Sequence, residues 1–188
     1  MSLFTNPAAA SREHADAYIA GILHALGDRD AFRVLETTPA DFARLIDGLT
    51  AAELRAPEGS GKWSLQQVLA HMADSEVVWS LRLRMVLTHD RPPLTGYDQD
   101  LWAERLGYGE TDTAQSLRVF AVLRESNLRL LRRATPADLQ RFGVHAERGE
   151  ESVQHMIRLY AGHDIVHLRQ LERIRDVVTR RESRPPRQ

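Results

Sequence analysis

Apolar residues recur along most of this 188-residue chain at the three- and four-residue spacings that place side chains on one face of a helix. Four long stripes predict helices over about 11–26, 64–88, 113–134 and 151–178, and a shorter stripe predicts an additional short helix near 38–48. No segment alternates apolar and polar residues for long enough to predict a strand. Stripes this wide face a shared core, so the sequence predicts an all-α fold, a four-helix bundle with one additional short helix.

Two of the helix starts carry the same four residues, Thr-Pro-Ala-Asp, at 38–41 and 135–138. Threonine is a good N-cap, and proline suits the first helical position because the N–H that it lacks has no partner there. We therefore expect helices to begin at Thr38 and at Thr135.

A long connection and a basic end frame the expected domain. Residues 89–112 contain two prolines and three glycines, and a link of this length is expected to be functional or to cross from one end of the bundle to the other. Residues 179–188 are polar, basic and proline-containing, which predicts a disordered tail. Residues 1–178 are then expected to form a single domain.

Composition removes several chemistries. The chain has no cysteine, which excludes disulfide frameworks, cysteine-ligated zinc, iron–sulfur clusters and thiol nucleophiles, and which fits the cytosol. No apolar run approaches the roughly 18 residues of a membrane span, and the N-terminus lacks the pattern of a signal peptide. We expect a cytoplasmic protein with no membrane partner.

Charge is unevenly spread along the chain. Residues 1–112 carry 10 basic and 17 acidic side chains, whereas residues 113–188 carry 15 basic and 9 acidic ones. The basic excess keeps nucleic acid as an alternative partner, which the arginine-rich tail would contact. No helix-turn-helix pattern supports that alternative.

Two histidines occupy the inward face of the last predicted helix. His163 and His167 continue a seam of apolar residues, and side chains at i and i+4 lie on one face with Cβ atoms about 5–6 Å apart. Two imidazoles so placed can bind one ion through bonds of about 2.0–2.1 Å. The alternatives are a hydrogen-bonded pair of core histidines and an exposed pair.

A third histidine, His71, lies midway along the 64–88 helix at the edge of the same core. Three histidines from two helices leave an open position for water or substrate, as catalytic zinc sites do. Asp164, beside His163, is a candidate catalytic base or a residue that orients a ligand, and its alternative is an ordinary salt bridge. Glu76 is expected to pair with Arg124, and its alternative is to orient His71 or another group.

These residues also resemble a known family. Residues 63–76, Trp-Ser-Leu-Gln-Gln-Val-Leu-Ala-His-Met-Ala-Asp-Ser-Glu, resemble the second helix of the DinB/YfiT-like superfamily, and residues 145–149 and 160–170 resemble its last helix and the loop before it. The resemblance implies a four-helix bundle, a divalent ion that is commonly zinc or nickel, and a homodimer. Carried over by position, it implies that the metal ligands are His71, His163 and His167.

The same resemblance suggests an activity. Some members of the superfamily are thiol S-transferases that use low-molecular-weight thiols such as bacillithiol, mycothiol or glutathione. It therefore implies a metal-dependent S-transferase or hydrolase acting on small molecules, with Asp164 as the catalytic candidate. The sequence leaves two alternatives open: a metal-binding stress or sensor protein without catalysis, and a nucleic-acid partner.

Overall fold

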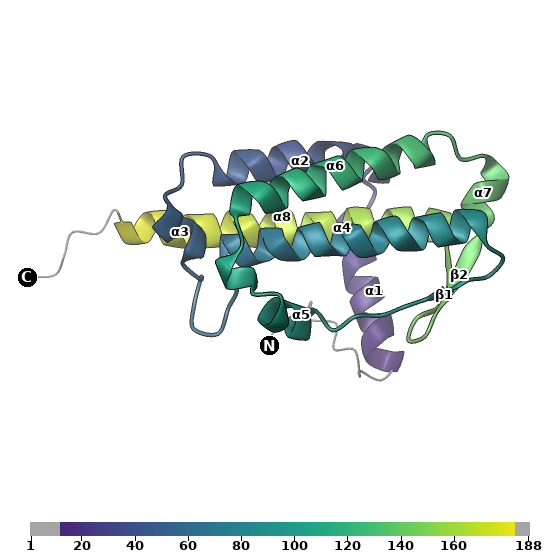
Figure 1. Ribbon diagram of the computed structural model, residues 1–188, viewed down its shortest axis with the longest axis horizontal. Coiled ribbons are helices and arrows are strands. Elements are labelled where there is room, and N and C mark those ends of the chain that lie inside the picture. The colour runs from purple at the N-terminus through teal and green to yellow at the C-terminus, as the bar shows by residue number, and fades with distance from the viewer. Residues whose placement is uncertain (1–11, 183–188) are drawn as a thin grey trace, which may run out of the picture.

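The computed structural model describes residues 12–182, which form a four-helix bundle with a small sheet at one end (Figure 1). In chain order the elements are α1 Arg12–Leu26, α2 Ala31–Ile46, α3 Ala51–Arg55, α4 Leu65–Thr88, β1 Pro93–Leu94, α5 Gln99–Arg105, the 3-10 turn η1 Tyr108–Glu110, α6 Thr113–Leu131, α7 Pro136–Gln140, β2 Phe142–His145, β3 Gly149–Ser152 and α8 Val153–Glu182. The prediction of an all-α bundle is confirmed. Within the described residues, no helix has an apolar stretch long enough to cross a membrane.

The bundle consists of α2, α4, α6 and α8, and α1 lies across it against α8 (Figure 1). The link at 89–112 carries β1, α5 and η1 back along the outside, so that α4 and α6 run in the same direction. This confirms the predicted crossover. The sequence analysis counted the helix at about 11–26 as a member of the bundle and the helix near 38–48 as an addition to it, and this assignment was wrong. The first of these is α1, which crosses the bundle, whereas the second belongs to α2, which is one of the four bundle helices.

The interior of α2 explains that difference. Thr38 is not an N-cap: the helix begins after Asp30, whose side chain accepts a hydrogen bond from the backbone N–H of Arg33, and it runs on through Pro39. A proline inside a helix leaves the carbonyl four residues earlier without its usual donor. Here that carbonyl belongs to Leu35, and Nη1 of the buried Arg124 donates to it at 3.1 Å. A partner distant in sequence therefore lets the helix continue.

The sheet is a second departure from the sequence prediction. β2 and β3 form an antiparallel hairpin, and the two residues of β1 pair in parallel with β2. Such strands are too short for alternation to reveal them. A Cβ at Gly143 would lie 2.7 Å from the side chain of Leu94, so glycine permits the close approach of β1 and β2.

The last helix is longer than expected. α8 continues to Glu182, four residues into the segment predicted to be a disordered tail, and Thr179 Oγ1 donates to the carbonyl of Arg175 at 2.9 Å. Arginine and glutamate are good helix formers, which suits this extension. Residues 183–188 lie outside the described part of the chain, and for them the disordered tail stays a prediction.

Two apolar clusters fill the bundle, and a polar layer separates them. One cluster is centred on Trp79, Leu83 and Met156, and the other on Phe42, Leu69 and Leu171. Between them the helices contribute buried polar side chains: His71, Glu76, Arg124, Asn127, Asp164 and His167. Buried polar groups are costly unless they are bonded, so this layer is where specific chemistry is expected.

The close contact of α1 with α8 yields a prediction. A Cβ at Gly162 would lie 2.4 Å from the carbonyl oxygen of Ile22, on a backbone that cannot easily move. Exchanging glycine for alanine inside a helix normally stabilises a protein by about 1 kcal/mol. We expect Gly162→Ala to reverse the sign and lower the free energy of unfolding by about 1–3 kcal/mol. Urea denaturation measures this, with Gly109→Ala as the control, because a Cβ there would meet no atom of the described residues within 4 Å beyond its chain neighbours.

Candidate metal centre

The polar layer brings three imidazoles together. His71 comes from α4, and His163 and His167 lie one turn apart on α8; one ring nitrogen of each lies within 4.8 Å of the others. Nε2 of His163 is 3.1 Å from Nε2 of His167 and 3.4 Å from Nε2 of His71. Ligands about 2.0–2.1 Å from a tetrahedral zinc ion are about 3.3 Å from each other. The spacing therefore suits a single ion.

The protonation of the rings also suits metal binding. Burial lowers the pKa of His71 and His163 well below their ordinary value and lowers that of His167 to about 4. All three rings are consequently neutral at pH 7, and each keeps one nitrogen lone pair. His167 Nδ1 lies 2.8 Å from Oε1 of Gln170, which can only accept there, so Nδ1 carries the proton and the lone pair of Nε2 faces the other rings.

Two buried ring nitrogens lack partners. Nδ1 of His71 and Nδ1 of His163 have no hydrogen bond among the described residues, although both atoms are buried. An ion bound through Nε2 leaves the proton of each of these two rings on Nδ1. Neutral imidazoles whose Nε2 atoms converge are a donor set that divalent ions accept, and the residues present fit such an ion.

Gln170 was not predicted from the sequence, although it lies three residues after His167 on the same helix face. A residue that orients a metal-binding histidine typically contributes 10–100-fold to metal affinity. We expect Gln170→Ala to weaken zinc binding by about that factor, as measured by competition with a chromophoric chelator. Glu172→Ala, which changes an exposed residue on the same helix, is expected to leave the affinity unchanged.

The second set of predicted residues forms a buried ion cluster. Arg124 donates to Glu76 from Nε at 3.0 Å and from Nη2 at 2.9 Å, which confirms the predicted pair. It donates to Asp164 from Nη1 at 2.5 Å and from Nη2 at 3.0 Å. Each of the three side chains is at most 1% exposed. Arg124 thus donates to both carboxylate oxygens of Asp164, and this favours the alternative in which Asp164 forms a salt bridge. A catalytic role for Asp164 stays a prediction.

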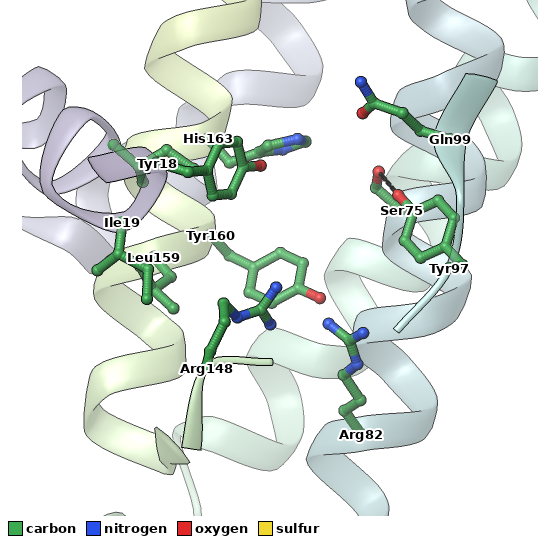
Figure 2. A pocket seen from close by; sticks show the side chains of 11 residues that line it. Tyr18, Ile19, Ser75, Arg82, Tyr97, Gln99, Arg148, Leu159, Tyr160 and His163 are labelled. Carbon is green, nitrogen blue, oxygen red and sulfur yellow. Dashed lines mark hydrogen bonds between the residues drawn. The ribbon is translucent and has the colours of Figure 1, made fainter. Parts of the chain in front are cut away.

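A cavity of about 60 Å³ lies beside His163 (Figure 2). Its wall includes His163 and five residues that the sequence analysis did not select as functional. These five are Tyr18, Ser75, Arg82, Tyr97 and Arg148. The sequence contains an indication for one of these five residues, Arg82. Arg82 follows Ser75 and Trp79 at spacings of seven and three residues, so a charged side chain stands on the inward face of α4.

Hydroxyl groups link the cavity to the three histidines. Ser75 Oγ lies 2.7 Å from the phenol oxygen of Tyr97 and 3.4 Å from Nε2 of His71. Burial raises the pKa of Tyr97, so the phenol stays protonated at neutral pH. The wall of the cavity therefore offers hydrogen-bond donors close to the imidazoles.

The fold and the site together indicate the class of protein: a helical bundle with a metal-binding group of three histidines in its central layer. Comparison with known proteins places the chain more closely: residues 34–171 match the family model of the DinB superfamily, and the chain belongs to that superfamily. The recognition made from the sequence is confirmed.

Relatives of known name agree with this assignment. The chain is 31% identical over 134 residues to a protein of Oceanobacillus iheyensis, an alignment that covers 71% of this chain and 77% of the relative. It is 29% identical over 145 residues to YfiT of Bacillus subtilis, which covers 75% and 82% respectively. Both relatives bear the name "putative metal-dependent hydrolase".

A solved structure of YfiT from Bacillus subtilis has the same fold. It superposes with a TM-score of 0.71 at 24% sequence identity, covering 97% of this chain and 99% of that chain. YfiT is described as having an unusual four-helix bundle topology. The arrangement of α2, α4, α6 and α8 is thus shared with a known structure.

Proposed function

We propose that the protein is a metal-dependent enzyme that holds one divalent ion, zinc or nickel, on His71, His163 and His167 and acts on a small molecule in the adjoining cavity. The observation that carries the proposal is the convergence of the three Nε2 atoms beside that cavity. The names of the relatives support hydrolysis as the reaction class. Transfer of a low-molecular-weight thiol to an electrophile is the finer proposal.

The chemistry needs an open coordination position. A divalent ion with three protein ligands lowers the pKa of a water or thiol bound in the remaining position, and so supplies a nucleophile at neutral pH. The chain contributes the rest. Gln170 fixes the ring of His167, and the protonated phenol of Tyr97 donates a hydrogen bond to an oxygen of the substrate.

Cobalt substitution tests whether the site is open. We expect the visible spectrum of the cobalt-loaded protein to change when a small thiol such as cysteamine is added, because a thiolate enters the coordination sphere. His71→Ala removes one ligand and is expected to abolish both cobalt binding and the change. A cobalt spectrum that stays constant in the presence of small thiols would identify a structural ion and refute the thiol transferase.

A further inference from the structure

Two arginine side chains line the cavity, and among the described residues one carboxylate, that of Glu151, interacts with both of them. Figure 2 shows Arg82 from α4 and Arg148 from the β2–β3 turn pointing into the space around Tyr160. Arg148 is paired, since its Nε and Nη2 lie 2.5 and 3.2 Å from the two carboxylate oxygens of Glu151. Arg82 forms no ion pair among the residues whose side chains the structure describes.

The groups that contact Arg82 directly are polar and uncharged, although the charges of Arg148 and Glu151 act on the same space. The residue is only 6% exposed, and its Nη2 donates to the carbonyl of Thr95 and lies 3.3 Å from Nε2 of His145. Its buried Nε has no hydrogen-bond partner in the part of the chain that the structure describes. A buried guanidinium is costly when it lacks a counter-charge and a full set of acceptors. Two arginines and one glutamate leave the cavity with a net positive charge.

An oxyanion in the cavity would satisfy these groups. Carboxylate and phosphate oxygens accept the parallel N–H groups of a guanidinium, and such charge-assisted bonds are about twice as strong as neutral ones. Burial raises the pKa of both Tyr97 and Tyr160, so their phenols remain hydrogen-bond donors to an anion. At about 30 Å³ per water molecule in the liquid, the volume equals that of roughly two water molecules, which admits a small anionic group.

We infer that Arg82, assisted by Arg148, binds the carboxylate or phosphate group of the substrate, so that the protein acts on small anionic molecules. This inference rests on the proposed function, because the same cavity is lined by His163 and by Ser75 beside His71. The anionic group occupies the arginine side of the cavity, and the reacting group of the substrate reaches the three histidines.

The first experiment needs no metal chemistry. The purified full-length protein is titrated by calorimetry with succinate, with inorganic phosphate and with succinamide, the neutral counterpart of succinate. We expect at least one of the two oxyanions to bind, succinamide to bind no better than background, and Arg82→Gln to weaken oxyanion binding about tenfold or more. The oxyanion that binds more tightly shows whether the charged group of the substrate is a carboxylate or a phosphate. Arg118→Gln, an equal change of charge at an exposed position of α6, is the control.

The second experiment connects the anion site to the histidines. Cobalt-loaded protein is titrated with N-acetylcysteine and with its neutral amide, and the visible spectrum is recorded. We expect the carboxylate form to bind about tenfold more tightly in the wild type and in Arg82→Lys, and the preference to vanish in Arg82→Gln.

Separate outcomes overturn the two proposals. If neither thiol alters the cobalt spectrum, the open metal site fails, and calorimetry with succinate and phosphate still decides the anion site. If neither oxyanion binds in the calorimeter, or if Arg82→Gln binds oxyanions as tightly as the wild type, the assignment of Arg82 is wrong even when both thiols bind cobalt.

Discussion

Replacing Arg124 with methionine is expected to lower the free energy of unfolding by roughly 3–5 kcal/mol, the largest effect on stability of any change considered. The substitution leaves the buried carboxylates of Glu76 and Asp164 without their cation. It also removes the hydrogen-bond donor to the Leu35 carbonyl, and Pro39 cannot replace that donor because proline has no backbone N–H. Urea denaturation followed by circular dichroism at 222 nm measures the loss.

Two further variants separate charge from packing. Combining Arg124→Met with Glu76→Gln and Asp164→Asn neutralises the stranded carboxylates and is expected to restore part of the lost stability. Arg118→Met, at an exposed position of the same helix, is expected to change stability by less than about 0.5 kcal/mol. A loss of under 1 kcal/mol for Arg124→Met would mean that the cluster does not hold the polar layer together.

Zinc is expected to stabilise the protein by about 4 kcal/mol at pH 7 when free zinc exceeds the dissociation constant a thousandfold. The reason is that the three imidazoles converge only in the folded state. Burial lowers the pKa of all three below 6.5, so protons do not compete with the ion at pH 7, whereas the stabilisation is lost as acidification approaches the His167 pKa of about 4. Thermal and urea unfolding with and without a chelator measure the increment.

The variant His71→Ala provides the comparison for that experiment. It removes the ligand from α4 and leaves both ligands on α8, so the increment from zinc is expected to fall to a small fraction of the wild-type value. Equal stabilisation of wild type and variant would show that zinc acts elsewhere on the chain.

The sequence predicted those features that depend on spacing within one helix. The i,i+4 pair His163 and His167 needs only helical geometry to share a face. The position of His71 beside the apolar stripe of another helix, at the edge of the core, indicated that it reaches the same layer. The pair of Glu76 and Arg124 was predictable for the same reason, since both interrupt apolar faces.

Features that depend on distant contacts were not predictable. Thr38 and Pro39 have the local pattern of a helix start, but the helix begins after Asp30 and continues through Pro39, where Arg124 on α6 donates to the carbonyl of Leu35. The strands of the sheet have two to four residues, too few for a pattern. Arg148 becomes a wall of the cavity because a hairpin carries it there, and no periodicity in the sequence describes a hairpin of this length.

Elemental analysis of the untagged, purified protein tests the metal centre most directly. The account predicts about one divalent ion per chain in the wild type and in the His155→Ala control, and none in the double variant His163→Ala with His167→Ala. Equal and sub-stoichiometric metal in the wild type and the double variant would contradict it.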